Sequence, residues 1–520
     1  MLSKIRQIED LREIIRQGGG PDAVAAQRRK GKLTARERLA ALFDPHDFTE
    51  LDVFARHLGR DYGLDRIDRI PADGVIIGHG RVGGRPVAAF SQDFTVLAGT
   101  CGEMHGRKIA RIVELAATMG CPLVGLMDSG GGRVSEELGA LSQYGRIFHQ
   151  QVQASGVVPQ LALILGPVAG GQAYSPALMD VIFMVEGTAT MFLAGPPLVE
   201  AVVHEHITEE ELGGARLHAR ESGTSDLTCR DDLHAIGEAR RLLSFLPSSN
   251  REGGPPEVET GDDPGRLLEE LPGLLPVDPE ATYDMHRVLE LLLDRGELFE
   301  LKPEYAENLI TGLGRIGGRS VGIVASNPGH RAGCIDTRAA VKAARFVRFC
   351  DQFGIPLLTL QDVPGFLVGS RSEREGIVRH GAKMLYAYAE ATVPKVTVVL
   401  RKAYAGGYLA LCPKELGADF VFGLPTAEIG LMGPQGAVSV LFRKELARAA
   451  AAGEDVAALR DTLGREFRDR YLDPLYPAGL QVVDDIIDPR ELRRVVHRAL
   501  ELCRGKRHEP PRRKHGNLPL

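Results

Sequence analysis

The sequence predicts an α/β protein built from two tandem copies of one domain. Short apolar runs such as PLVGLMD and QLALILG alternate with segments whose apolar residues recur at helical spacing, a pattern typical of buried parallel strands covered by helices. Segments of the first half return in the second half at an offset of roughly 235 residues. A polar stretch rich in Pro and Gly lies between the two halves.

Four pairs of segments carry the internal duplication. They are GRVGGRPVAAFSQD (Gly80 to Asp93) with GRIGGRSVGIVASN (Gly314 to Asn327), GCPLVGLMDSGG (Gly120 to Gly131) with GIPLLTLQDVPG (Gly354 to Gly365), ASGVVPQLALILGPVAGG (Ala154 to Gly171) with ATVPKVTVVLRKAYAGG (Ala391 to Gly407), and DVIFMVEGTATMFLAGP (Asp180 to Pro196) with DFVFGLPTAEIGLMGP (Asp419 to Pro434). The pairs keep one order and nearly one offset, which chance similarity would not do. Because the period is too long for a solenoid, the halves are homologous domains.

The boundary between the domains is predicted in PSSNREGGPPEVETGDDPG, residues 247–265, which has no apolar period. We therefore expect domains at residues 1–255 and 256–520. Each begins with a helical run followed by an extended one, near residue 40 and near residue 290. The segments RKIARIVELAATMG and RAAVKAARFVRFCDQFG have helical spacing and each ends in Gly, a frequent helix terminator.

Composition and charge narrow the class of function. The 520 residues carry a formal net charge of -6, which argues against nucleic acid as the main partner. No apolar run is long enough to span a membrane, and the amino terminus, MLSKIRQIEDLREIIRQ, is typical of an amphipathic surface helix. We therefore expect a cytoplasmic protein that binds no membrane. None of the seven cysteines forms a C-x-x-C pair, so we expect reduced thiols and no metal site.

Two motifs resemble cofactor or metal sites but are better explained otherwise. Gly78, Gly80 and Gly83 fit G-x-G-x-x-G, and Gly312 to Gly317 repeat the pattern, but each string runs into a strand instead of a helix. A β-hairpin turn is the preferred interpretation of both. In HEHITEEELGG, Thr208 stands where H-E-x-x-H requires a second His, so we expect a capped helix start on the surface.

Two glycine pairs are the strongest catalytic candidates. Gly170-Gly171 and Gly406-Gly407 each follow a buried strand and precede a run that can be helical. Without side chains, such a turn can aim main-chain N–H groups at an oxyanion, helped by the helix N-terminus. The alternative is a turn needed only for close packing of helix on strand. Its recurrence in both halves favours the catalytic interpretation.

A second loop follows another buried strand in each half. SGGGR (Ser129 to Arg133) offers main-chain donors and one Arg, which would suit a carbonyl or a phosphate-bearing ligand. Its counterpart DVPGF (Asp362 to Phe366) has Pro and Phe in place of the open glycines, so the two halves should bind different groups. No nucleophile–base signature accompanies either loop, so either the substrate brings the base or the sequence conceals it.

At these residues the sequence resembles the carboxyltransferase (β) subunits of propionyl-CoA and related biotin-dependent acyl-CoA carboxylases. The resemblance covers essentially the whole chain and is carried by FSQDFTV, SGGGR, ELGGA, DVPGFLVG, RHGAKMLYAYAEATVPKVTVVLRKAYAGGY, LMGPQGAV and the closing RKHGNLPL. It implies two tandem crotonase-like (ClpP/crotonase) domains, in agreement with the duplication. It also implies a homohexamer, in which each active site lies between the amino-terminal domain of one chain and the carboxy-terminal domain of another.

The resemblance implies a role for each domain. The amino-terminal domain would bind the acyl-CoA and hold the thioester enolate with the amides of Gly170 and Gly171. The carboxy-terminal domain would bind carboxybiotin, with Gly406 and Gly407 donating to the ureido oxygen, and the biotin anion left by decarboxylation could take the α-proton, which would explain the missing base. The further contacts implied are Gly130, Gly131, Gly132, Arg133, Ala169 and Leu409 for the acyl-CoA, and Val363, Pro364, Gly365, Phe366 and Tyr404 for biotin.

Missing motifs refine this role. The chain has neither a biotin-attachment A-M-K-M nor a glycine-rich ATP-binding loop, so the biotin carboxylase and the biotin carrier would be separate partner chains. The lack of a C-x-x-C pair distinguishes it from zinc-bearing acetyl-CoA carboxylase β subunits. The predicted reaction is transfer of the carboxyl group of carboxybiotin to the α (or vinylogous) carbon of a short-chain acyl-CoA, foremost propionyl-CoA or acetyl-CoA.

Two departures leave the acyl group open. Members of the propionyl-CoA group have Asp at a position lining the acyl pocket where this chain has Leu409, and FLAGPPLV (Phe192 to Val199) is more similar to the methylcrotonyl-CoA group. Methylcrotonyl-CoA or another acyl-CoA is thus a second candidate acceptor.

Three rival functions remain open beside carboxyl transfer to an acyl-CoA: a subunit of a biotin-dependent decarboxylase, a biotin-independent hydratase or isomerase, and a scaffold. The decarboxylase subunit would use the same site in reverse, so sequence separates it poorly. A hydratase or isomerase needs a side-chain acid or base, for which neither half shows a clear candidate. The intact glycine pairs disfavour a scaffold.

Overall fold

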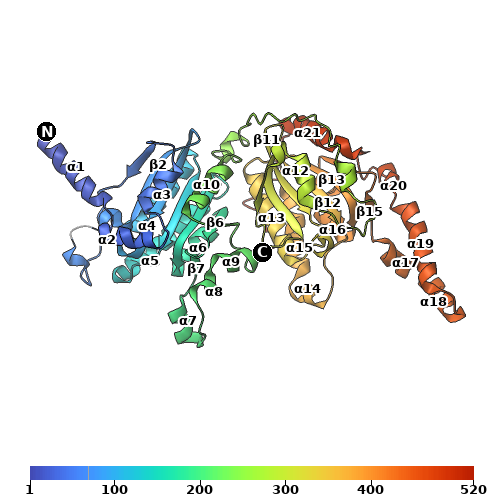
Figure 1. The fold of residues 1–520 in the computed structure, drawn as a ribbon, viewed down its shortest axis with the longest axis horizontal. Coiled ribbons are helices and arrows are strands. Elements are labelled where there is room, and N and C mark those ends of the chain that lie inside the picture. Colours follow the sequence, from blue (N-terminus) through green and yellow to red (C-terminus); the bar gives the residue numbers. More distant parts are fainter. Residues whose placement is uncertain (68–69, 520) are drawn as a thin grey trace. The chain divides into compact units, whose positions relative to one another are not determined.

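The computed structural model describes residues 1–67 and 70–519, so Leu520, the last residue of the predicted second domain and of the closing motif, lies outside it. The chain divides into two compact units, Met1–Pro255 and Pro256–Leu520, here called unit 1 and unit 2. Each contains a sheet flanked by helices (Figure 1). The predicted α/β class and its tandem arrangement are confirmed.

Unit 1 is built on an eight-stranded sheet in the order β1-β2-β3-β4-β5-β6-β8, with β7 beside β5. The pairs β1–β2 and β2–β3 are antiparallel and the remaining pairs are parallel. The strands are β1 (Phe48–Leu51), β2 (Val75–Val82), β3 (Arg85–Gln92), β4 (Leu123–Ser129), β5 (Gln160–Ala169), β6 (Val181–Val185), β7 (Thr190–Phe192) and β8 (Leu227–Cys229). Because β4 and β6 are buried along their whole length, they read as continuous apolar runs in the sequence.

The helices of unit 1 are α1 (Leu2–Arg16), α2 (Pro21–Arg29), α3 (Ala35–Leu42), α4 (Glu103–Met119), α5 (Glu137–Ala154), α6 (Tyr174–Ala177), α7 (Pro196–Val203), α8 (Glu209–Gly213), α9 (Ala215–Arg220) and α10 (Asp232–Leu243). Along the sheet, α4 packs against α5 and α3 packs against α10. The helix predicted from RKIARIVELAATMG is α4, which ends at Gly120 in the left-handed conformation. Thr208 caps α8 through a reciprocal box with Glu211, which confirms the predicted helix start.

Unit 2 repeats this sheet in the order β9-β10-β11-β12-β13-β14-β16, with β15 beside β13. Its strands are β9 (Leu298–Leu301), β10 (Leu309–Ile316), β11 (Arg319–Ser326), β12 (Leu357–Val363), β13 (Lys395–Tyr404), β14 (Phe420–Gly423), β15 (Glu428–Gly430) and β16 (Asp485–Ile486). Its helices are α11 (Leu271–Leu274), α12 (Met285–Leu292), α13 (Thr337–Gln352), α14 (Ser370–Arg374), α15 (Ile377–Glu390), α16 (Ala405–Ala410), α17 (Pro434–Leu441), α18 (Arg443–Ala452), α19 (Val456–Tyr471), α20 (Leu475–Gly479) and α21 (Leu492–Leu502).

The two G-x-G-x-x-G strings form hairpin turns, as predicted. Gly83 and Gly84 join β2 to β3 with φ values of 57° and 78°, and Gly317 and Gly318 join β10 to β11 with φ values of 61° and 79°. Two consecutive left-handed residues are what a tight two-residue hairpin requires. These glycines therefore connect strands and do not open a helix.

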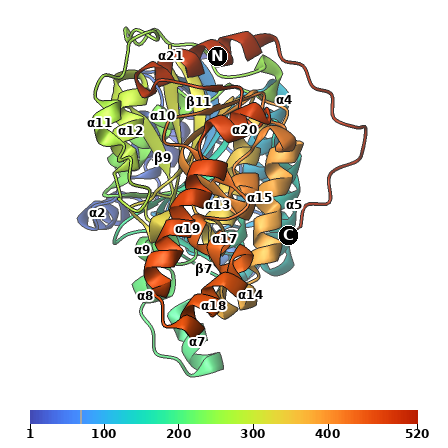
Figure 2. The ribbon, with the colours of Figure 1, turned by 90° about the vertical axis from the view of Figure 1, so that its right-hand side faces the viewer.

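Some helices extend away from the sheet of their own unit. In unit 1, α7 projects from the body, and in unit 2 the helices α17 to α19 do so (Figures 1 and 2). α17 packs against α19 around a small cluster formed by Val438, Leu446 and Leu463. α7 buries none of its residues within the chain, and its Leu198 and Val202 are exposed. Exposed apolar side chains on a projecting helix are typical of a contact with another chain.

Among the residues that the structure describes, none of the helices combines the length and the apolar character needed to cross a membrane.

Candidate functional site

The glycine turn predicted in unit 1 lies where β5 ends. Gly170 and Gly171 follow Ala169 and open a short 3-10 helix, η5 (Gly170–Ala173). Gly170 has a φ of 69°, in the left-handed region, where Gly meets no steric penalty. Within the described part of the chain, neither of the two amide N–H groups donates a hydrogen bond, and Gly171 is exposed. First-turn amides of this kind are free to bind an oxyanion.

The SGGGR loop lies beside this turn. Gly131 has a φ of 100°, and a Cβ built on it would lie 3.0 Å from the carbonyl oxygen of Ala169. The N–H of Gly130 donates to the carbonyl of Ala98 (2.9 Å), and the N–H of Gly131 donates to Ser129 Oγ (3.1 Å). Both of these amides are therefore used to fix the loop. What the loop offers a ligand is an open surface without side chains.

Tyr144 of α5 lies against both glycine segments. A Cβ built on Gly171 would lie 3.5 Å from its ring, and one built on Gly132 would lie 3.6 Å from it. The Tyr144 hydroxyl is buried without a well-formed hydrogen bond, beside the thiol of Cys101. Burial raises the pKa of the Tyr144 phenol and raises the pKa of the Cys101 thiol to about 12. Both groups are therefore neutral at physiological pH and are not bases.

Arg133 turns away from the open surface of the loop. Only 4% of the residue is exposed. Its Nη1 donates to Asp73 (2.6 Å) and to Glu136 (2.7 Å), and its Nη2 donates to the carbonyl of Thr100 (2.9 Å). The sequence led us to expect that this guanidinium binds the ligand. The structure instead uses it to neutralise buried carboxylates, which cannot remain unpaired in the interior, so Arg133 holds the loop in place.

In unit 2 the corresponding turn begins one residue earlier than the predicted pair. β13 ends at Tyr404, so Ala405 and Gly406 hold the places that Gly170 and Gly171 hold after β5. The pairing of β12 with β13 and of β4 with β5, which share a bulge at the same point, gives the same correspondence. Ala405 has a φ of 50°, left-handed although it carries a Cβ. The predicted correspondence of the two glycine pairs is therefore wrong by one residue.

Gly407 takes the third place after the strand, where unit 1 has Gln172, and it is buried. A Cβ built on Gly407 would lie 2.9 Å from Gly365 Cα and 2.9 Å from Val363 Cγ2. One built on Gly406 would lie 3.0 Å from the ring of Phe366. The structure thus brings the DVPGF loop, including the half-buried Pro364, against this turn. Both glycines are needed here for close approach.

The main-chain N–H groups of the unit 2 turn are free to donate to a ligand. In the part of the chain that the structure describes, the N–H groups of Ala405 and Gly406 donate to no residue. Tyr404 is buried, and its hydroxyl donates to Glu428, which pairs with Arg468 (2.8 Å). Burial raises the pKa of Tyr404, so the phenol stays neutral. Leu409 lies on α16 with 47% of its surface exposed.

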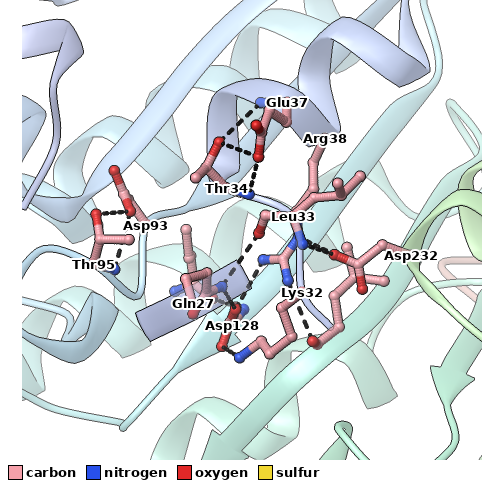
Figure 3. Close-up of polar contacts among 12 residues, drawn as sticks. Gln27, Lys32, Leu33, Thr34, Glu37, Arg38, Asp93, Thr95, Asp128 and Asp232 are labelled. Atoms are coloured by element: carbon pink, nitrogen blue, oxygen red, sulfur yellow. Dashed lines mark hydrogen bonds and ion pairs between the residues drawn. The ribbon is translucent and has the colours of Figure 1, made fainter. Parts of the chain in front are cut away.

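A buried carboxylate, Asp128, lies at the bulge that precedes the SGGGR loop (Figure 3). It accepts hydrogen bonds from Lys32 Nζ (2.7 Å), Arg38 Nη1 (2.9 Å) and Gln27 Nε2 (2.9 Å). Arg38 also donates to Asp232 (2.7 Å). Lys32 and Arg38 of the amino-terminal segment therefore neutralise the buried carboxylate of Asp128 at the end of β4. Because their charges are paired in the interior, they are not available to a ligand.

These arrangements stabilise negative charge with main-chain donors at two turns. No group of three or more His, Cys, Asp or Glu side chains within residues 1–67 and 70–519 is placed to hold a metal ion. Three residues at the turns, Tyr144, Gln172 and Ala405, escaped the sequence analysis. The four-residue spacing of Tyr144 and Phe148 on one helix face is a signal that could have found the ring; the other two carry none.

Comparison with known proteins agrees with this architecture. The family described as carboxyl transferase domain matches residues 26–518. The chain is 47% identical to methylmalonyl-CoA decarboxylase subunit alpha of Propionigenium modestum over 99% of both chains, and 49% identical to the propionyl-CoA carboxylase beta chain of Saccharopolyspora erythraea over 96% of this chain and 93% of that one. Among solved structures, it is 46% identical to transcarboxylase 12S, a hexamer described with methylmalonyl-coenzyme A and methylmalonic acid bound, with a TM-score of 0.95 over 100% of this chain and 99% of that one.

Proposed function

The chain belongs to the carboxyl transferase family, and from this membership we propose that it is a carboxyltransferase subunit that moves a carboxyl group from carboxybiotin to an acyl-CoA. The observation that carries the proposal is the pair of turns with open main-chain donors, one after β5 and one after β13. Two separate oxyanion turns fit a reaction in which negative charge develops on two oxygens, one on each substrate.

Unit 1 is proposed to bind the acyl-CoA. The amides of Gly170 and Gly171 would hold the thioester oxygen as it takes on negative charge in the enolate. Removing one donor of this kind typically costs about 100- to 1,000-fold in rate. The bare surface of the SGGGR loop would let the thioester approach closely, while the ring of Tyr144 closes the space behind the turn. Arg133 is assigned to holding the loop.

Unit 2 is proposed to bind carboxybiotin carried by a separate chain. Gly406 belongs both to the predicted pair and to the pair found by strand register, so its amide is the first candidate to hold the ureido oxygen. The ring of Phe366, packed against this turn, offers a flat apolar surface to the bicyclic ring. Biotin would supply the carboxyl group and, after losing it, a base for the α-proton. The chain then needs no base of its own, in keeping with the neutral state of Tyr144 and Cys101.

Propionyl-CoA is the proposed acceptor. The relatives include a methylmalonyl-CoA decarboxylase, propionyl-CoA carboxylases and a methylmalonyl-CoA carboxyltransferase, at 47%, 46–49% and 47% identity. Each of these names contains either propionyl-CoA or methylmalonyl-CoA, two thioesters that differ by one carboxyl group. Carboxylation of propionyl-CoA is therefore the first candidate. Decarboxylation of methylmalonyl-CoA is the second, because the identity to that subunit is equally high.

A homohexamer is the proposed assembly. The 12S relative assembles as a hexamer, and the exposed apolar side chains of α7 are suited to a subunit contact. Each chain would supply one turn of each kind, and assembly would combine them into complete sites. The biotin carrier would be a further partner.

The decisive experiment is to incubate the full chain with malonyl-, methylmalonyl- or methylglutaconyl-CoA, with and without free biotin, and to follow decarboxylation. We expect turnover of methylmalonyl-CoA that depends on biotin. Biotin-independent turnover, or no turnover of any thioester, would contradict the proposal. Capture of a biotin carboxylase from the source cells would favour carboxylation as the physiological direction, and capture of a decarboxylase complex would favour the reverse.

A further inference from the structure

A chain of buried hydrogen bonds links the glycine turn of unit 1 to the SGGGR loop. Gln172 Nε2 donates to Gln92 Oε1 (2.6 Å), Gln92 Nε2 lies 3.1 Å from His105 Nε2, and His105 Nδ1 lies 2.9 Å from the carbonyl oxygen of Asp73. The side chain of Asp73 then accepts from Arg133 (2.6 Å). None of the five residues is more than 4% exposed.

The direction of each bond can be assigned. The main-chain N–H of Asp128 also donates to Gln92 Oε1 (3.3 Å), so the amide oxygen of Gln92 faces two donors and its NH2 group faces His105. His105 must therefore accept at Nε2 and donate at Nδ1 to the carbonyl of Asp73. This requires a neutral ring, and burial lowers the pKa of His105 to about 3. The bonds thus run with one polarity from Gln172 to Asp73.

Unit 2 provides an internal comparison, because Gln92, His105, Gln172 and Arg133 are not repeated there. The matching positions, found from strand pairing, helix starts and the loop backbone, are Ser326 for Gln92, Ala339 for His105, Gly407 for Gln172 and Leu367 for Arg133. Ser326 is fully buried, and its hydroxyl has no partner among the described residues. The turn of unit 2 is held instead by packing of Phe366 against Gly406. The hydrogen-bonded chain therefore belongs to the acyl-CoA side alone.

The side chain of Gln172, at one end of this series of hydrogen bonds, is not arranged for maximal stability. Gln172 Oε1 is buried and accepts no hydrogen bond from the residues that the structure describes. An unpaired buried acceptor of this kind destabilises the folded state. The side chain keeps this orientation through its Nε2 bond to Gln92. This argues that the orientation of Gln172 serves the turn and not the stability of the core.

We infer that Gln92, His105 and Gln172 are positioning residues, which hold the Gly170–Gly171 amides in a fixed relation to the SGGGR loop. Gln172 directly follows Gly171, so a shift of its side chain changes the backbone angles of Gly171 and with them the direction of the Gly171 N–H that donates to the oxyanion. An error of about 1 Å in such a position can cost about 100-fold in rate. This inference rests on the proposed function and extends it. It assigns the alignment of the turn to the hydrogen-bonded side chains of Gln92, His105 and Gln172, which lie outside the glycine motifs.

The test compares Gln172→Leu, His105→Leu and His105→Gln with the wild type in biotin-dependent decarboxylation of methylmalonyl-CoA by the full chain. Gln at position 105 offers an acceptor oxygen near the place of Nε2, so it should rescue the bond from Gln92. We expect the two Leu variants to lose about 10- to 100-fold in kcat with KM for the thioester within about threefold of wild type. The His105→Gln variant should stay within about threefold of wild type in kcat. Ser326→Ala, at the matching place of unit 2, should change neither constant.

The outcomes separate this inference from the proposed function. A wild type without turnover would overturn the proposed function and this inference together. With an active wild type, an unchanged kcat in Gln172→Leu, or a rise in KM alone, would overturn the inference only. A His105→Gln variant as slow as His105→Leu would also overturn it. Calorimetric binding of coenzyme A to each variant verifies that the protein is folded, and a variant that binds normally but turns over slowly supports the positioning role.

Discussion

Arg401 of β13 and Gly166 of β5 occupy the same position in their two sheets. Each lies two residues before the first residue that pairs with the neighbouring strand after the bulge, which is Ala403 in unit 2 and Val168 in unit 1. Arg401 Nε donates to Asp362 (2.8 Å), the buried carboxylate of that bulge. In unit 1 a Cβ on Gly166 would lie 2.0 Å from Asp128 Oδ1 and 2.5 Å from Lys32 Nζ. One strand residue therefore supplies the charge in unit 2, whereas the amino-terminal segment supplies it in unit 1.

Arg38→Leu should destabilise unit 1. The variant leaves Asp232 without its ion pair and Asp128 with Lys32 alone, and breaking a buried ion pair typically costs about 3–5 kcal/mol. The free energy of unfolding in urea measures the effect. Arg16→Leu, which removes an exposed pair with Glu13, is the control and should change it by less than about 1 kcal/mol. Equal effects of the two variants would show that burial does not decide the strength of these pairs.

Gly407→Ala should impair turnover more than stability. The new Cβ would meet Gly365 Cα at 2.9 Å, a main-chain atom that can move only with the DVPGF loop. We expect kcat of biotin-dependent decarboxylation to fall about 10- to 100-fold. Gly237→Ala, on an exposed face of α10 with open space around it, should have no effect on kcat. Wild-type activity of Gly407→Ala would remove the unit 2 turn from the catalytic assignment.

Gly170→Ala should be tolerated, in contrast to substitution of Gly407. No atom lies within 4 Å of a Cβ built on Gly170, and Ala405 already carries a Cβ at the matching place of unit 2. The left-handed φ of 69° should cost about 1–2 kcal/mol in unfolding free energy. Steady-state kinetics should show less than a tenfold loss in kcat. A loss above 100-fold would mean that the two turns do not share one backbone geometry.

Leu409→Asp should change the preference among acyl groups. Leu409 is half exposed on α16, so an Asp there can be accommodated without burial of its charge. We expect the ratio of kcat/KM for propionyl-CoA over methylcrotonyl-CoA to rise by about tenfold, the size of effect that a small change in a pocket produces. The assay is carboxylation of each thioester in parallel. An unchanged ratio would place Leu409 outside the acyl pocket.

Lys108 should make unit 1 more stable as the pH rises above about 8. Burial lowers its pKa from 10.5 to about 8 in the folded protein. Between these values the unfolded chain binds more protons than the folded chain, so the unfolding free energy increases with pH. Urea unfolding at pH 7, 8.5 and 10 should show the wild type gaining stability relative to Lys108→Met. A gap that stays constant across this range would contradict the lowered pKa. Lys342, whose pKa is also lowered to about 8, should behave alike.

Much of the fold could be predicted because local patterns decide it. The hairpin turns at Gly83 and Gly317, the helix that ends at Gly120 and the capped helix at Thr208 all depend on residues adjacent in sequence. Because the two halves are homologous, the duplicated segments could each be predicted from two sequences. These features are present in the structure because turn and cap geometry allow few residue types.

The alignment of the turns could not be predicted in the same way. Glycine identity matched Gly170 with Gly406, but the left-handed residue of unit 2 is Ala405, and only the backbone reveals it. Arg133 lies three residues before one partner, Glu136, but its other partner, Asp73, lies 60 residues away in the sequence and is identified only by tertiary proximity. A loop sequence shows which donors exist; it does not show which of them the interior already uses.

The sequence separation of the buried ion pairs has a consequence for the order in which they can form during synthesis. In unit 2, Arg401 finds Asp362 only 39 residues away, so this pair can form as soon as two neighbouring strands exist. In unit 1, the partners of Arg38 are Asp128, which lies 90 residues later in the sequence, and Asp232, which lies 194 residues later. Closing so long a loop is entropically costly before the intervening sheet is in place. The amino-terminal segment, which is synthesised before both of these partners, is therefore expected to be among the last parts of unit 1 to reach its native contacts.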